Sequence, residues 1–132
     1  MSIRCLIVDD NESFMEIAGA LLKREGLTVV GVTSTSADAL RKVANLRPDV
    51  VLVDIFLGEE SGLELARQLT NGGPDVSATV ILISTHAQSD LEDLIAGSPA
   101  AGFLPKAELS AKAVLEIVEG RSNDGAVGRR GR

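Results

Sequence analysis

Six acidic, hydroxyl and basic residues each follow a short apolar run in this 132-residue chain: Asp9, Asp10, Asp54, Ser84, Thr85 and Lys106. Three carboxylates that met at one edge of a sheet would repel each other and raise one another's pKa unless a cation neutralised them. No His or Cys stands beside them, and their hard oxygen atoms favour Mg²⁺, or Mn²⁺ in its place, over zinc. The set therefore predicts a magnesium site.

The loop after the first apolar run argues against a nucleotide or flavin cofactor. It reads Asp9-Asp10-Asn11-Glu12-Ser13, whereas a phosphate-binding loop before a helix is usually rich in glycine. Its negative charge would repel a phosphate in the absence of a metal. The chain also has no Trp and no Tyr, the usual stacking partners of a flavin ring.

Each of these residues, taken alone, also has a purely structural explanation. An acidic residue after a strand often caps the next helix, and a single Lys is usually solvated. The functional prediction therefore depends on their occurrence together, each at the end of a predicted strand.

Size and composition predict one domain. A chain of 132 residues with 45% hydrophobic content fills one core without disulfides, and the single cysteine, Cys5, is most simply a buried side chain. No apolar stretch approaches the about 20 residues that span a bilayer, and no signal peptide is present, so we expect a cytoplasmic protein without membrane contact. A net charge of −6 argues against nucleic-acid binding by this chain.

The charge is unevenly distributed. Residues 120–132, GRSNDGAVGRRGR, carry four Arg and one Asp, a net +3 that leaves −9 on residues 1–119. This Gly- and Arg-rich segment has no apolar period, so we predict a disordered tail at 120–132 after a domain at 1–119.

Five predicted strands position the polar residues. Three runs, Ile3–Val8, Val50–Val53 and Val80–Ile83, are apolar at consecutive positions, as in strands buried on both faces of a parallel sheet. Thr28–Val32 and Gly102–Leu104 are weaker candidates.

Segments with helical spacing follow each predicted strand. The first ends at Gly26, and the second runs from about Ser36 to before Pro48 and buries Leu40, Val43 and Ala44. The third runs from about Ser61 to Thr70 and ends at Gly72 and Gly73. The fourth runs from Ser89 to before Pro99, and the fifth follows Ser110. This alternation predicts an α/β fold: an open, doubly wound parallel sheet with helices on both faces and a ligand site at the carboxyl ends of the strands.

Four stretches, "LIVDDNESF", "PDVVLVDIFLGEESGLEL", "VILIST" and "AAGFLPKAEL", resemble the receiver domain of bacterial two-component response regulators. The resemblance extends from Ile3 to about Glu119. It implies a flavodoxin-like fold with five strands in the order 2-1-3-4-5 and five helices, and a single-domain regulator of the chemotaxis type.

The resemblance also implies a role for each site residue. Asp54 would be the phosphoacceptor, and Mg²⁺ would bind Asp54, Asp10 directly, Asp9 through water, and Phe56 through its backbone carbonyl. Lys106 would be the family's cation. The residues of the switch would be the hydroxyl of Ser84 and the ring of Phe103, with Thr85 shaping the phosphoryl pocket through its backbone.

The function implied is phosphorylation of Asp54 by a sensor histidine kinase, a phosphotransfer protein or an acyl phosphate. Positioning and charge compensation matter more to this transfer than a strong base. The signal would pass by phosphorylation-dependent binding of a downstream protein. The chain would not be an enzyme, beyond catalysing its own phosphorylation and hydrolysis.

The sequence departs from the family at three places, and a fourth position, His86, has two interpretations. Gly58 and Ala107 stand where Pro is common, and Phe103 lacks the hydroxyl of the Tyr often found there. The resemblance leaves a cis peptide between Lys106 and Ala107 open. His86 is either an exposed loop side chain or a residue that controls access of the hydrolytic water.

The residues bear on three other functions. A receiver-like binding module that is not phosphorylated conflicts with the complete set of site residues. A phosphohydrolase with an Asp nucleophile usually needs a second carboxylate two residues on, where Phe56 stands. The chain is also compatible with the receiver half of a longer DNA-binding transcriptional regulator.

Overall fold

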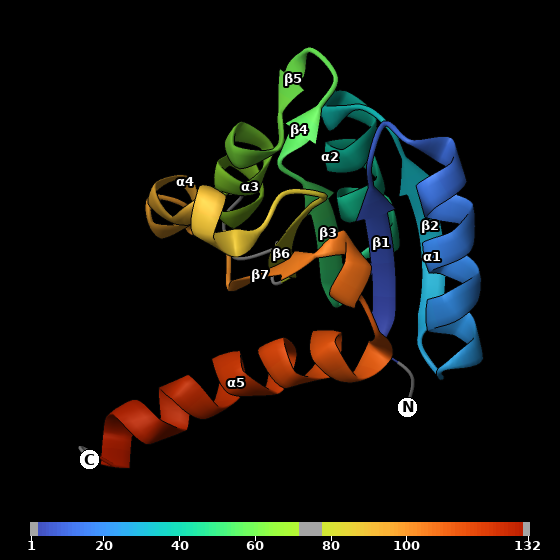
Figure 1. Ribbon diagram of the computed structural model, residues 1–132. Coiled ribbons are helices and arrows are strands. Elements are labelled where there is room, and N and C mark those ends of the chain that lie inside the picture. Colours follow the sequence, from blue (N-terminus) through green and yellow to red (C-terminus); the bar gives the residue numbers. More distant parts are fainter. Residues whose placement is uncertain (1–2, 72–77, 131–132) are drawn as a thin grey trace.

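Five parallel strands form the main sheet of the computed structural model, which describes the backbone of residues 3–71 and 78–130 and the side chains within these ranges up to residue 120 (Figure 1). They are β1 (Arg4–Val8), β2 (Thr28–Thr33), β3 (Val50–Asp54), β6 (Thr79–Ser84) and β7 (Gly102–Pro105). Their order is β2-β1-β3-β6-β7, and each neighbouring pair is parallel. Counted among these five strands, this is the predicted order 2-1-3-4-5.

Five helices cover the two faces of this sheet (Figure 1). Residues of α1 and α5 pack on one face, and residues of α2, α3 and the α4 region pack on the other. The helices are α1 (Glu12–Arg24), α2 (Ser36–Leu46), α3 (Gly62–Thr70), α4 (Glu92–Ala96) and α5 (Ala111–Arg130), with short 3-10 helices η1 (Gln88–Asp90) and η2 (Lys106–Glu108). The predicted doubly wound fold is confirmed.

Strands buried on both faces explain the apolar runs that lack alternation. In β1, Leu6 and Val8 belong to the core under α2 and α3, while Cys5 and Ile7 belong to the core under α1 and α5. All four are 0% exposed. Because successive side chains of a strand point to opposite faces, a strand between two helical layers must be apolar at every position.

Two helices differ from the sequence prediction. The fourth is only a 3-10 turn followed by the five residues of α4, none of them buried. In α2, Leu40 and Ala44 are exposed, and the helix buries Ala39 and Val43 instead. The prediction was therefore correct for Val43 and wrong for Leu40 and Ala44. Ala39, one residue before Leu40, is buried in its place. The predicted helix end at Gly72 and Gly73 lies outside the described residues.

A β-hairpin that we did not predict follows β3. Its strands are β4 (Phe56–Leu57) and β5 (Glu60–Ser61), which pair antiparallel across a two-residue turn. Gly58 opens the turn with φ 60°, and glycine at the first central position is what a type II′ hairpin turn requires. This explains the glycine where the family often has proline.

The last helix continues past the predicted domain boundary. The backbone of α5 is helical to Arg130, where composition predicts a disordered tail from residue 120. A helix that packing has nucleated gains one backbone hydrogen bond for each residue it adds, which lets polar residues continue it. The domain boundary at residue 119 stays a prediction. No helix among the described residues is long and apolar enough to span a membrane.

Candidate functional site

Three carboxylates converge at the carboxyl ends of β1 and β3. Asp9 and Asp10 follow β1, and Asp54 is the last residue of β3, its neighbour in the sheet. One oxygen of each lies within 4.8 Å of the others. Asp9 and Asp54 are buried, at 0% and 6% exposure, whereas Asp10 is exposed. Sequence analysis predicted this cluster, and the parallel pairing of the two strands produces it.

Lys106 reaches the same cluster from η2, just after β7. Its Nζ lies 2.7 Å from Asp9 Oδ2 and 3.2 Å from Asp54 Oδ2. Its ammonium group also lies 4.5 Å from the ring centroid of Phe14, on the first turn of α1. Burial alone would lower the pKa of Lys106, but the two carboxylates outweigh it and raise the pKa above its ordinary value.

Asp54 is the carboxylate of the group whose ionised form its surroundings disfavour. Burial, opposed by the hydrogen bond from the Phe56 N–H and reinforced by the charge of Asp9, raises the pKa of Asp54 to about 6. Lys106 moderates this shift without cancelling it. A carboxylate in such surroundings is stabilised by any further positive charge.

The carboxylates are oriented by backbone N–H groups of the loops that follow them. Asn11 N donates to Asp9 Oδ1 at 2.9 Å, and Phe56 N donates to Asp54 Oδ1 at 3.1 Å. The Asn11 side chain in turn accepts from Phe14 N at 3.0 Å and caps α1. The start of α1 and the start of the hairpin therefore fix the site.

The donor set fits a hard divalent cation. Lys106 supplies one positive charge against the three carboxylates, so the cluster keeps a net negative charge. Asp9 Oδ2 is fully buried and accepts no hydrogen bond from the described residues, so its contact with Lys106 is an ion pair rather than a directed hydrogen bond. The three candidate ligand atoms are all carboxylate oxygens, as Mg²⁺ prefers.

Among the described residues, the Ser84 side chain forms no hydrogen bond with this cluster. Ser84 ends β6 and is 1% exposed. Its Oγ accepts a hydrogen bond from His86 N at 3.1 Å and shares another with His86 Nδ1 at 3.2 Å. Thr85, which follows, is exposed at the same edge of the sheet.

Two phenylalanines border the site in different ways. Phe103, on β7, is 9% exposed and lies in the core that also contains Leu91. Phe56, on β4, is 46% exposed, and its ring lies 5.2 Å from that of His86. The Lys106–Ala107 peptide is trans, as are all the others in the described residues, because the chain turns into η2 here without needing a cis bond.

Sequence analysis missed two residues that support the site. The sequence places Phe14 in the first predicted helix but gives no signal that it underlies Lys106. Gly62 was not singled out, although a Cβ there would lie 1.8 Å from the backbone oxygen of Asp54. Gly62 directly follows Ser61, the N-cap of α3, and so lies close to the end of β3. This position in the sequence was the signal that could have identified Gly62.

Comparisons with known proteins agree with this geometry. The family model of the response regulator receiver domain matches residues 5–119. The response regulator GacA of Pseudomonas viridiflava is 34% identical over 116 residues, which are 87% of this chain and 53% of that protein. The DNA-binding transcriptional activator DevR/DosR of Mycobacterium tuberculosis is 32% identical over 128 residues, 91% and 56% of the two chains.

A solved structure is similar over nearly its whole length. The NarL signal receiver domain from Mycobacterium tuberculosis superposes with a TM-score of 0.78 and 28% identity, covering 90% of this chain and 98% of that one. By contrast, this chain spans only about half the length of the curated relatives that it matches, 53% and 56% of the two named above.

Proposed function

The chain belongs to the response regulator receiver domain family, and on that premise we propose that it signals by accepting a phosphoryl group on Asp54. The observation that carries the proposal is the meeting of Asp9, Asp10 and Asp54 within 4.8 Å, with Lys106 bound to two of them. This arrangement gathers three negative charges at one edge of the sheet and places a cation beside two of them.

In the proposed reaction a carboxylate oxygen of Asp54 attacks the phosphorus of a phosphohistidine or an acyl phosphate. A P–O bond to Asp54 forms while the bond to the donor's nitrogen or oxygen breaks, and the donor leaves with that electron pair. Lys106 remains beside the group and offsets charge on the phosphoryl oxygens. Asp54 needs no general base, because at neutral pH it is largely ionised even with a pKa of about 6.

The proposed metal is Mg²⁺, with Mn²⁺ as a substitute. Asp10 and Asp54 would bind it directly, Asp9 through water, and Phe56 through its backbone carbonyl. When bound, the ion would supply charge compensation to the phosphoryl oxygens. The N–H groups of Asn11 and Phe56 keep Asp9 and Asp54 oriented for this role.

The proposed output is a change of surface rather than a chemical product. The aspartyl phosphate adds negative charge and strong acceptors, to which the Ser84 hydroxyl would turn, with Thr85 lining the pocket and Phe103 filling the space behind. The phosphoryl donor would be a sensor histidine kinase or phosphotransfer protein, and a downstream protein would bind the altered surface. We propose no other enzymatic activity for the chain, and its cytoplasmic location stays a prediction.

A second proposal follows from the length of the relatives. Because the chain spans about half of GacA and DevR/DosR, and DevR/DosR is named as DNA-binding, the same receiver fits as one half of a longer transcriptional regulator. DNA contact would then belong to the other half, since residues 1–119 carry a net charge of −9.

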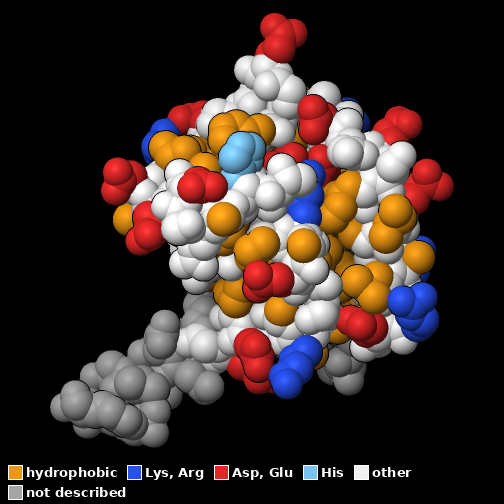
Figure 2. All heavy atoms as spheres, in the orientation of Figure 1, with side chains coloured by type: hydrophobic (Ala, Val, Ile, Leu, Met, Phe, Trp, Pro, Cys, Tyr) orange, Lys and Arg blue, Asp and Glu red, His pale blue; other side chains and the backbone are white. Residues whose placement is uncertain are grey.

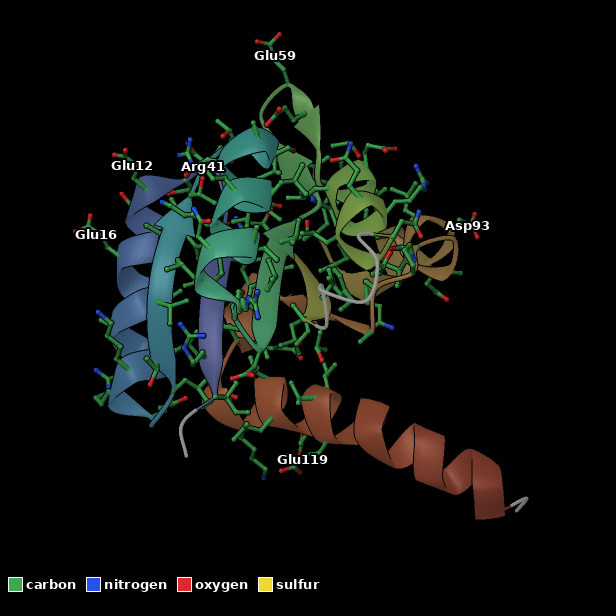
Figure 3. All side chains as sticks on the ribbon, turned by 180° about the vertical axis from the view of Figure 1, so that it is seen from behind. Glu12, Glu16, Arg41, Glu59, Asp93 and Glu119 are labelled. Atoms are coloured by element: carbon green, nitrogen blue, oxygen red, sulfur yellow. The ribbon has the colours of Figure 1, made fainter. Side chains whose placement is uncertain are left out.

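The test is intact mass after incubation with acetyl phosphate and Mg²⁺. We expect an added mass of about 80 Da, one phosphoryl group, for the wild type, and no adduct for Asp54→Asn or with a chelator. Asp93→Asn is the matched control, because Asp93 is an exposed acid on α4 that points away from the site (Figure 3).

Two results would contradict the proposal. One is an adduct that persists in Asp54→Asn, since it would place the phosphoryl group elsewhere. The other is the absence of both an adduct and beryllofluoride binding in the wild type, which would favour the binding module that is not phosphorylated.

A further inference from the structure

The hydroxyl of Ser84 is already engaged by a neighbouring side chain. His86 binds it twice: its backbone N donates to Ser84 Oγ at 3.1 Å, and its Nδ1 shares a hydrogen bond with the same oxygen at 3.2 Å. Ser84 is 1% exposed, so water has little access to replace either bond. In the tautomer whose Nδ1 accepts from the Ser84 hydroxyl, the proton of that hydroxyl must leave His86 before it can bond another acceptor.

The imidazole of His86 is itself held in place. Its ring lies 5.2 Å from that of Phe56, tilted by 55°, a separation and angle typical of favourable aromatic contacts. The Phe56 N–H donates to Asp54 Oδ1 at 3.1 Å. His86 thus connects the end of β6 with the start of the hairpin, whose first N–H bonds Asp54. The chain's only histidine is visible at the surface of this face, bordered by hydrophobic side chains (Figure 2).

The aromatic residue of the proposed switch needs no comparable movement. Phe103 is only 9% exposed and lies in the core with Leu91 and Leu82. The ring is therefore already inside while Ser84 Oγ still faces His86. Ser84 Oγ, by contrast, would have to exchange its partner His86 for a phosphoryl oxygen.

We propose that His86 is a positioning residue that holds the Ser84 hydroxyl away from Asp54, so that its side chain sets how readily the switch occurs. The inference rests on the proposed function and goes beyond it, since it assigns a restraint on the resting state to an imidazole outside the acidic cluster. Removing the Nδ1 bond should favour the state in which Ser84 bonds a phosphoryl oxygen.

Two substitutions separate the two contacts of His86. His86→Asn keeps a polar atom at the position of Nδ1 and removes the ring, whereas His86→Phe keeps a ring against Phe56 and removes the polar atom. Both retain the backbone N–H that donates to Ser84 Oγ. His86 is exposed on a loop, so neither change should disturb the core.

The measurement is the affinity for beryllofluoride with Mg²⁺, by calorimetry, in the wild type and both variants. We expect His86→Phe to bind about fivefold more tightly, the effect of one net hydrogen bond, and His86→Asn to stay within about twofold of the wild type. The same pair of measurements in a Ser84→Ala background completes a double-mutant cycle. There, His86→Phe should change nothing.

The outcomes separate the inference from the proposed function. If the wild type binds beryllofluoride but His86→Phe binds it no more tightly, the inference is overturned and the proposed function stands. A gain that persists in the Ser84→Ala background would also overturn it, because His86 would then act on access to the pocket. Failure of the wild type both to bind beryllofluoride and to form the phosphoryl adduct would overturn both.

Discussion

Asp54 combines burial with a charge that the fold does not fully compensate. It is 6% exposed, it lies beside Asp9, and its pKa rises to about 6 despite Lys106. Residues placed for chemistry often cost stability, because their surroundings favour the reacting state over the resting one. The ionised form of Asp54 should therefore weaken the fold at neutral pH when no metal is bound.

Asp54→Asn should raise the melting temperature of the metal-free protein. The amide keeps the size of the side chain and removes the buried charge, so we expect a gain of about 1 to 3 kcal/mol, or about 4 °C for each kcal/mol. Thermal unfolding at pH 7 in a chelator measures it, with the exposed Asp93→Asn as the control expected to change little. A lower melting temperature for Asp54→Asn would show that the ion pair with Lys106 outweighs the burial of the charge.

At this scale the sequence predicted which residues lie at the same edge of the sheet, but not every hydrogen bond between their side chains. Asp9, Asp10, Asp54 and Lys106 were predicted to share one edge because each follows a strand, and they do. The bond between Ser84 and His86 was not predicted. It depends on side-chain rotamers in a loop, for which neither periodicity nor spacing carries a signal.

Among the elements, the segment between β3 and α3 is held by several hydrogen bonds. The hairpin β4–β5 fills it, and Gly62 starts α3 with its N–H donating to Ile55 O at 2.9 Å. Glu60 of the hairpin also accepts from Ser36 N at 2.9 Å, at the first turn of α2. The backbone that carries Asp54 is therefore attached to two helices.

Gly62→Ala should damage both the fold and the site. The added Cβ would lie 1.8 Å from Asp54 O, so the backbone at Asp54 must shift, and we expect a loss of about 3 kcal/mol or more, at the upper end of single substitutions. Chemical denaturation measures the loss, and the yield of the phosphoryl adduct reports on the site.

Gly19→Ala is the matched control for that change. It lies inside α1, and a Cβ there would meet nothing within 4 Å. Replacing a helix-interior glycine by alanine should stabilise the protein by about 0.5 to 1 kcal/mol. Equal effects of the two substitutions would show that the close approach at Gly62 is relieved without cost.

The five main strands were predicted to within one or two residues at each end, because runs buried on both faces have few alternatives. The hairpin was missed because strands of two residues have no measurable period. In α2 the error had another cause. Leu40 and Ala39 are both apolar and adjacent, so composition alone did not decide which of them faces the sheet.

At the scale of the whole molecule, the apolar cores and a cluster of charged side chains meet at one edge of the sheet. Two apolar cores fix the strands from both faces, and the parallel arrangement brings the carboxyl ends of β1, β3 and β7 together with their charges. A ligand that binds only this assembled edge must stabilise the entire fold by linkage.

Mg²⁺ should therefore raise the melting temperature of the wild type. At ten times its dissociation constant the ion would add about 1.4 kcal/mol. This corresponds to about 6 °C, because each kcal/mol shifts the melting temperature by about 4 °C. Asp10→Asn should lose most of this gain, since Asp10 is the exposed carboxylate assigned to direct binding. Thermal scans with Mg²⁺ and with NaCl of equal ionic strength separate specific binding from screening, and equal shifts in both salts would contradict a metal site here.

The hairpin also makes the protein suitable as an optical sensor. Glu59 stands at its tip and points into solvent (Figure 3), while the hairpin begins two residues after Asp54 and is held by paired strands. The chain has no Trp, and its one thiol, Cys5, is buried with a pKa raised to about 12. A cysteine introduced at position 59 would therefore take a fluorescent label selectively and report on Asp54 from a rigid, nearby position.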